Sequence, residues 1–114
     1  MKTIRNLFFY GNYAFDFIKQ QNTPMQKKIK FVFDVLRYEQ FVPKRFLKHI
    51  EGTKGLYEIR IEAESNIIRI FCCFDEGQLI ILFNGFQKKS RKTPVREIQK
   101  AISLMKEYFE SKNL

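Results

Sequence analysis

Between residues 55 and 85, strand-like segments follow one another with only very short connections. The segments are residues 56–63, which alternate between apolar and polar side chains, and residues 67–74 and 79–83, which are mostly apolar. Ser65 and Asn66 in the first connection and residues 75–77 in the second are typical turn formers. Because connections this short cannot hold a crossover helix, neighbouring strands must run antiparallel. We therefore predict a three-strand antiparallel meander over residues 55–85.

Other elements flank the meander. Residues 1–10 have a strand pattern, residues 12–38 that of a helical pair, and residues 94–110 that of a C-terminal helix. Thr23 begins a capping-box pattern, with Pro24 at the first helical position of the second helix. The last helix is predicted to bury one apolar stripe, formed by Ile98, Ala101, Ile102, Met105 and Phe109.

Together these elements predict a single α+β domain over residues 1–114. We expect a small antiparallel sheet, made of the N-terminal strand plus the three-strand meander, packed by the two N-terminal helices and accompanied by the C-terminal helix. Residues 39–55 receive no element, because Pro43 interrupts any long helix there. Helices that cover one face of such a sheet leave the other partly open, and a functional site is expected on that open face.

The net charge of +9 is concentrated in two stretches. Residues 86–100 carry six cations and one carboxylate, and residues 44–54 carry four cations and one carboxylate. If folding brings the two stretches together, they form one basic surface that suits nucleic acid, an anionic membrane or an acidic protein segment. The alternative is a solubilising surface with no specific partner.

Metal, membrane and secretion signals are weak in this chain. Cys72 and Cys73 are adjacent in a strand, so their side chains point to opposite faces and are poorly placed to bond each other or share a metal. With one histidine and no Cys-x-x-Cys spacing, we predict no metal site and no cofactor. No segment approaches the length of a membrane span or a signal peptide, so we expect a cytoplasmic protein.

Two arginines interrupt the strands of the meander. Arg60 lies in the alternating strand and Arg69 in an apolar one. A tight turn at Ser65 would place Glu62 opposite Arg69, where the two would form a cross-strand ion pair. A phosphate-binding role for Arg69 is equally compatible with the sequence, and both can hold at once.

Several motifs resemble the phage-derived, HigB-like branch of the RelE/ParE toxin superfamily. They are Lys54-Gly-Leu-Tyr-Glu-Ile-Arg-Ile61, Ile68-Arg-Ile70 and Leu82-Phe-Asn-Gly-Phe-Gln-Lys-Lys-Ser-Arg-Lys-Thr-Pro94. The resemblance covers about residues 44–105. It implies a RelE-like domain that acts as the toxin of a type II toxin–antitoxin system. Such a toxin enters the ribosomal A site, cuts messenger RNA and is neutralised by a cognate antitoxin, often of the helix-turn-helix type.

Metal-free RNA cleavage needs a base for the 2′-hydroxyl, charge stabilisation at phosphorus and an acid for the 5′-oxygen. The candidates for charge stabilisation are Arg60, Arg69, Lys88 and Lys89. His49 is a candidate acid or base, and Glu58 is a candidate base. A lysine whose pKa is lowered by neighbouring cations is a further candidate base, and the lysines so placed are Lys48, Lys54, Lys88 and Lys89. Candidate RNA-binding residues are Lys44, Arg45, Lys48, Phe86, Arg91 and Lys92. A single histidine excludes a paired-histidine mechanism, and residues 86–94 lack the tyrosine that some relatives present there.

Two other functions remain open from the sequence. A gyrase-inhibiting toxin shares the fold but performs no RNA chemistry and needs no phosphate-compatible pocket. A phage-derived nucleic-acid-binding protein without toxicity would also fit the charge. The gathering of cations around the meander favours the nuclease.

Overall fold

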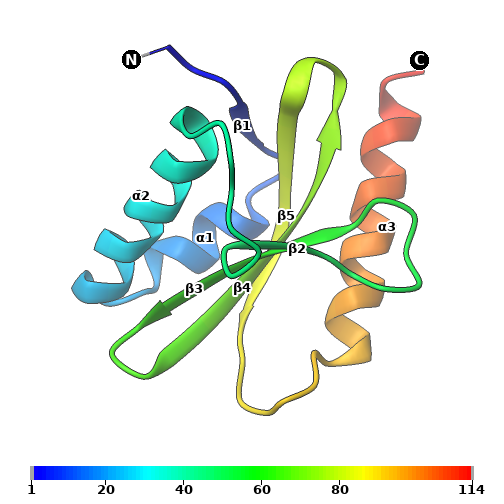
Figure 1. Cartoon of the computed structure of the whole chain (residues 1–114). Helices are drawn as coiled ribbons and strands as arrows, with labels where there is room; N and C mark the ends of the chain where they lie inside the picture. The colour runs from blue at the N-terminus through cyan, green and yellow to red at the C-terminus, as the bar shows by residue number, and fades with distance from the viewer. Residues whose placement is uncertain (1, 114) are drawn as a thin grey trace.

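The computed structural model describes residues 2–113, and it has the predicted α+β fold class (Figure 1). Residues 1 and 114, which the sequence prediction included in the domain, lie outside the described part. The strands are β1 (Asn6–Phe9), β2 (Leu47–His49), β3 (Tyr57–Ala63), β4 (Asn66–Asp75) and β5 (Leu79–Gln87). The helices are α1 (Tyr13–Lys19), α2 (Thr23–Tyr38), the short 3-10 turn η1 (Glu76–Gln78) and α3 (Val95–Ser111).

The five strands form one mixed sheet in the order β1-β5-β4-β3-β2. The meander β3-β4-β5 is antiparallel as predicted, but β1 pairs with β5 in parallel, so a purely antiparallel sheet was wrong. Only strands joined by a tight hairpin are obliged to run antiparallel. β1 is separated from β5 by most of the chain and is free of that constraint.

The strand β2 was missed by the sequence prediction. It lies in the segment around Pro43 that received no element, and it pairs antiparallel with β3 at the edge of the sheet. In this pairing Lys48 lies opposite Glu58 and His49 lies opposite Tyr57. Three residues are too few for an alternating pattern to be recognised, but they decide which face each of these side chains occupies.

The turn between β3 and β4 differs from the predicted one. Glu64 and Ser65 both have positive φ, 50° and 70°, and form the two central residues of the hairpin turn. This shifts the register from the predicted one, so Glu62 lies opposite Ile67 and not opposite Arg69. A two-residue turn with positive φ at both positions is usually formed by Asn and Gly. Glu and Ser are not typical of this turn, so its position could not be predicted from the sequence.

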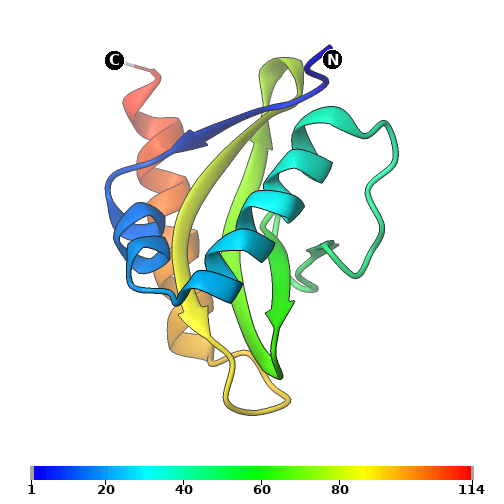
Figure 2. The same ribbon diagram turned by 90° about the vertical axis from the view of Figure 1, so that its left-hand side faces the viewer.

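Helices cover both faces of the sheet (Figure 2). α1 and α2 lie on one face and bury a cluster that includes Val32, Leu36 and Cys72. α3 lies on the other face over β4 and β5, and buries a cluster that includes Cys73 and Leu104. Both cysteines are buried and unpaired on opposite faces, which confirms the prediction from strand alternation. The second face is therefore open only toward β3 and β2.

The apolar stripe of α3 was predicted with an error. Ala101, Leu104 and Tyr108 are the buried residues, whereas Ile102 and Phe109 are 39% and 37% exposed. The helix packs along a line rotated from the predicted stripe, because its position is set by β4 and β5. The start of α2 also differs by one residue, because the Asn22 side chain, not Thr23, accepts the capping hydrogen bond from the Met25 amide at 3.0 Å.

An irregularity in β5 decides where the residues after it point. Leu82 lies opposite Cys72, but Gly85 lies opposite Ile70, so one extra residue is accommodated on β5. Regular alternation from Leu82 would put residue 86 on the α2 side, and the bulge reverses this. Gly85 is needed at this point because a Cβ there would lie 2.5 Å from the Phe17 ring.

No helix within residues 2–113 is both long and apolar enough to span a membrane.

Candidate functional site

Two arginines face each other across the β3–β4 pair. Arg60 lies directly opposite Arg69, so both side chains project from the sheet face that α3 leaves open. Like charges in this arrangement repel, and each guanidinium is held by a carboxylate of β3. The Glu62 Oε1 atom accepts a hydrogen bond from Arg60 at 3.0 Å, and Glu58 Oε1 lies 2.8 Å from Arg69 Nη1.

The Glu58–Arg69 pair lies beneath the surface, whereas the Arg60–Glu62 pair is at the rim. The side chains of Glu58 and Arg69 are 9% and 10% exposed, against 33% for Arg60. Within the buried pair, Glu58 Oε2 and Arg69 Nε have no hydrogen-bond partner among the described residues. Buried polar atoms are nearly always satisfied, so these two atoms are exceptions within the described part of the chain.

Lys88 joins the two arginines because of the bulge in β5. Phe86 lies opposite Arg69, and the Lys88 amide donates to the Ile67 carbonyl at 2.8 Å, so Lys88 follows on the same face. The pKa of Lys88 is lowered, first by burial and then by the charges of Arg69, Arg60 and Lys48, while Glu58 opposes the shift. In the sheet, Lys48 lies opposite Glu58, and Arg69 both bonds Glu58 and lies opposite Arg60. Together with Lys88, these residues form one cluster of four cations around one buried carboxylate.

We name this group the cationic cluster: Lys48, Glu58, Arg60, Arg69 and Lys88. It draws Lys48 from one basic stretch of the sequence and Lys88 from the other, so folding brings these two members of the stretches together. Among residues 2–113, no group of three or more His, Cys, Asp or Glu side chains is arranged to hold a metal ion.

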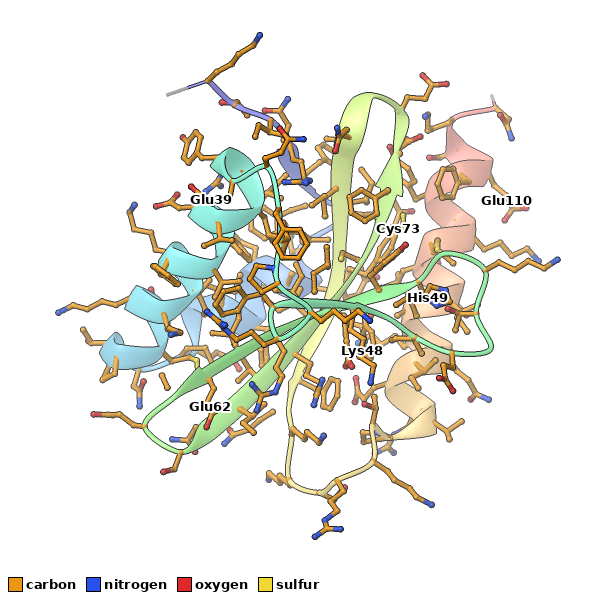
Figure 3. All side chains as sticks on the ribbon, viewed as in Figure 1. Glu39, Lys48, His49, Glu62, Cys73 and Glu110 are labelled. Carbon is orange, nitrogen blue, oxygen red and sulfur yellow. The ribbon has the colours of Figure 1, made fainter. Side chains whose placement is uncertain are left out.

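His49 lies apart from the cationic cluster. Lys48 and His49, both labelled in Figure 3, are neighbours on β2. Because successive side chains of a strand alternate, the two point to opposite faces of the sheet. The His49 ring contacts the Tyr57 ring at a centroid distance of 5.2 Å, and Nε2 lies 3.1 Å from the Thr53 carbonyl oxygen. The structure therefore does not bring the single histidine to the arginines.

The remaining predicted residues occupy three places. Lys54 is exposed in the turn between β2 and β3, and Lys44 and Arg45 are exposed before β2, where Arg45 lies over the Phe46 ring at 4.6 Å on the α2 side. Lys89, Arg91 and Lys92 are exposed in the loop that joins β5 to α3. Only this loop continues directly from the cluster.

Phe86 is not a free surface for a base. It is 8% exposed and stacks on Phe71, with ring centroids 5.5 Å apart and planes 21° apart. The predicted base-stacking role is therefore replaced by a core role, because the bulge turns Phe86 toward the α3 cluster. Sequence reasoning also missed Asn84, which is 2% exposed and donates from Nδ2 to the carbonyl and carboxylate oxygens of Glu97 at the start of α3. A polar residue inside an apolar run was the available signal.

Comparison with known proteins gives a family and a fold. The family described as phage-derived protein Gp49-like (DUF891) matches residues 16–106. No curated protein matches the chain. The phage-derived part of the sequence resemblance agrees with this family, whereas membership of the HigB-like branch stays a prediction.

Two solved structures share the fold. A chain of the archaeal RelE–RelB complex from Pyrococcus horikoshii OT3 is 16% identical, with a TM-score of 0.56 over 78% of this chain and 99% of that one. A chain of the RelB–RelE antitoxin–toxin complex from Methanococcus jannaschii is 20% identical, with a TM-score of 0.54 over 76% of this chain and 99% of that one. The architecture is thus that of RelE-type toxins, and with most of its length matched, the chain belongs to the Gp49-like family of phage-derived proteins.

Proposed function

We propose that this chain is the toxin of a type II toxin–antitoxin system and that it cleaves messenger RNA on the ribosome without a metal. The family match to phage-derived proteins and the RelE-type fold support a toxin. The proposal includes a cognate antitoxin of the helix-turn-helix type. It also places the protein in the cytoplasm, where ribosomes and messenger RNA are found.

The observation that carries the proposal is the cationic cluster on the open part of the sheet. Arg60 and Arg69 project side by side, and both arginines and Lys48 lie close enough to Lys88 to lower its pKa. Guanidinium and ammonium groups bind phosphate oxygens through charge-assisted hydrogen bonds, which are stronger than hydrogen bonds between neutral groups. A nuclease that lacks a metal needs such donors where negative charge grows on the phosphate in the transition state.

The reaction divides into three tasks. The 2′-hydroxyl loses its proton and its oxygen attacks phosphorus. The bond to the 5′-oxygen breaks and this oxygen takes a proton from water, so the products are a 2′,3′-cyclic phosphate and a 5′-hydroxyl. Arg60 and Arg69 are assigned to the phosphate oxygens. Lys88 is assigned to accept the 2′-hydroxyl proton, because burial and its cationic neighbours lower its pKa and so increase its neutral fraction.

We expect cleavage to depend on the ribosome because of the residue types that the cationic cluster lacks. Within the described residues, the cluster contains neither a histidine nor a tyrosine, because His49 is on the other face. We therefore expect slow cleavage of free RNA and faster cleavage on the ribosome, which orients the messenger for in-line attack.

The test is purified protein added to a translation reaction, with the 5′ ends of the messenger mapped and plasmid supercoiling assayed in parallel. We expect cuts only in translated regions and little cleavage of the same RNA without ribosomes. Equal cleavage of free RNA would contradict ribosome dependence. Altered supercoiling without RNA cleavage would establish the gyrase inhibitor instead. If the protein neither cleaves RNA nor alters supercoiling, the nucleic-acid-binding function is the one that remains.

A further inference from the structure

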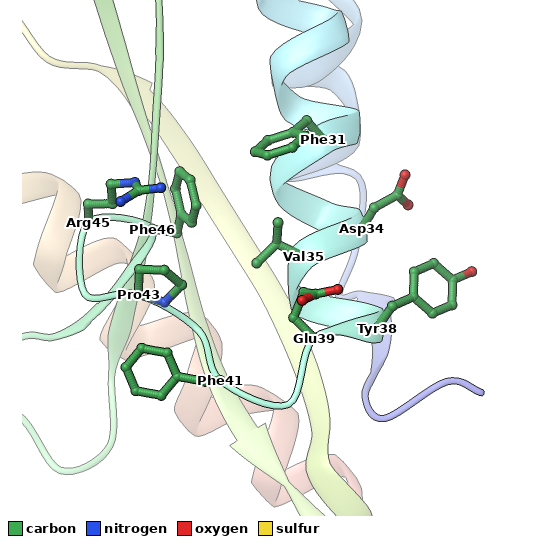
Figure 4. Close-up of a pocket in the computed structure, with 9 residues that line it drawn as sticks. All are labelled: Phe31, Asp34, Val35, Tyr38, Glu39, Phe41, Pro43, Arg45 and Phe46. Carbon is green, nitrogen blue, oxygen red and sulfur yellow. The ribbon is translucent and has the colours of Figure 1, made fainter. Parts of the chain in front are cut away.

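A groove of about 420 Å³ runs between α2 and the segment that leads to β2. Phe31 and Val35 on the helix face Phe41, Pro43 and Phe46 across it (Figure 4). Phe31 and Phe41 are 52% and 78% exposed, an unusual degree for phenylalanine. The proposed nuclease mechanism uses none of these side chains.

A second hollow continues the groove along the same helix. It is lined by Pro24, Lys27, Lys28, Phe31, Glu62 and Ala63. Phe31 belongs to both hollows, so together they follow α2 from its first turn to its last. A helix of this length extends for about 24 Å. We name the two hollows together the α2 groove.

The free charges at the edges of the α2 groove are mostly positive. Among the described residues, three lining cations have no carboxylate within ion-pair distance: Lys27, Lys28 and Arg45. Of the lining carboxylates in that part of the chain, Glu39 alone has no cation within this distance. The other two lining carboxylates are already paired: Asp34 with Lys30 and Arg37, and Glu62 with Arg60.

Two of these cations are held over aromatic rings at the groove. Lys28 Nζ lies 5.1 Å from the centre of the Phe31 ring, and the Arg45 guanidinium lies 4.6 Å from that of Phe46. A cation over a ring keeps its remaining donors available for a carboxylate. The groove therefore combines an apolar floor with cations fixed at its edges.

We infer that the α2 groove binds an acidic, amphipathic helix of a partner protein. The apolar face of such a helix would cover Phe31, Val35 and Phe41, and its carboxylates would meet Lys28 and Arg45. RNA fits less well, because the groove is lined mainly by apolar side chains and includes the carboxylate of Glu39. Naming this partner as the antitoxin rests on the proposed function, but the groove chemistry does not.

The probe is a synthetic helical peptide of about 18 residues, with leucines at helical spacing on one face and glutamates on both flanks. A scrambled peptide of the same composition lacks the apolar face. Binding is measured by fluorescence anisotropy, and the contacted residues are mapped on the full chain by amide chemical shifts.

Matched variants separate the groove from general hydrophobicity and charge. Phe31→Ser is compared with Phe15→Ser, because Phe15 is 46% exposed elsewhere. Arg45→Glu is compared with Lys106→Glu, which makes the same change in net charge at an exposed position of α3. We expect Phe31→Ser and Arg45→Glu each to weaken binding about 10-fold, or about 1.4 kcal/mol, and the two controls to bind like the parent chain.

The outcomes are decisive in either direction. Shifts confined to α2 and residues 39–46, lost in both groove variants, would support the inference. It would be overturned by no binding at millimolar peptide, by equal binding of the scrambled peptide, or by displacement of the peptide by single-stranded RNA. Lys88→Ala should keep peptide binding, and Phe31→Ser should keep any messenger cleavage. The two proposals can therefore fail independently of each other.

Discussion

Arg60 and Arg69 lie directly opposite each other on β3 and β4, and each is held by a carboxylate of β3 at a distance of 3.0 Å or less. The two arginines differ in burial, with side chains 33% and 10% exposed. Substitutions at them should therefore separate effects on phosphate binding from effects on folding.

Arg60→Ala and Lys88→Ala should each reduce messenger cleavage by about 10²- to 10³-fold, because the first removes a charge contact made in the transition state and the second removes the proposed base. Their melting temperatures should stay near that of the parent chain, since neither residue belongs to the two apolar clusters. Single-turnover cleavage on ribosomes and thermal melts measure the two quantities. Full activity in both variants would show that the site assignment is wrong, even with the family correct.

Glu58→Gln should destabilise the protein by about 3 kcal/mol, because it leaves the buried Arg69 guanidinium without its countercharge. Replacing both partners, as in Glu58→Gln with Arg69→Met, should cost less than the sum of the two single changes. Urea unfolding of the three variants measures this coupling. Additive free energies would mean that the pair contributes nothing as a pair.

Leu104→Ala should lower the free energy of unfolding by about 2 to 5 kcal/mol, since Leu104 is 4% exposed in the cluster beneath α3. Ile102→Ala should cost less than about 1 kcal/mol, because Ile102 is 39% exposed. Ile102 belongs to the apolar stripe predicted from the sequence, and the loss expected of a buried residue does not apply to it at this exposure. Denaturant melts of both variants test the observed orientation of α3.

Asp75 should make stability depend on pH in the acid range. Hydrogen bonds from Lys112 at 2.6 Å, from Tyr108 at 2.5 Å and from the Glu76 amide lower the pKa of Asp75 from 3.8 to about 2. A folded-state pKa below the unfolded one gives stability that is present above pH 3.8 and lost as the pH falls toward 2. Melting temperatures between pH 5 and pH 2 should fall less steeply for Asp75→Asn than for the parent chain.

Replacing Glu64 and Ser65 by Asn and Gly should stabilise the β3–β4 hairpin. Both residues adopt positive φ, which costs most L-residues about 1 kcal/mol or more each. We expect the melting temperature to rise by about 4 °C or more. An unchanged or lower value would indicate that the left-handed turn is not a source of strain. The register, and so the Arg60–Arg69 pairing, should remain, as cross-strand nuclear Overhauser effects would show.

The sequence by itself determined the elements whose signals are local. Alternation and short turns gave the antiparallel meander, helical spacing and Pro24 gave α2, and the opposite faces of Cys72 and Cys73 followed from strand geometry. The motif that contains Gly85 and Lys88 also predicted a phage-derived family, in agreement with the Gp49-like match. Each of these depends on residues that are near one another in the chain.

Only the tertiary structure decided which side chains meet. The left-handed turn at Glu64 set Arg60 opposite Arg69, the bulge beside Gly85 brought Lys88 to the same face, and the short strand β2 sent Lys48 there and His49 away. A shift of one residue in a strand reverses every face after it, and nothing in the local composition records such a shift. The site therefore depends on registers and bulges that only the packed sheet and its helices fix.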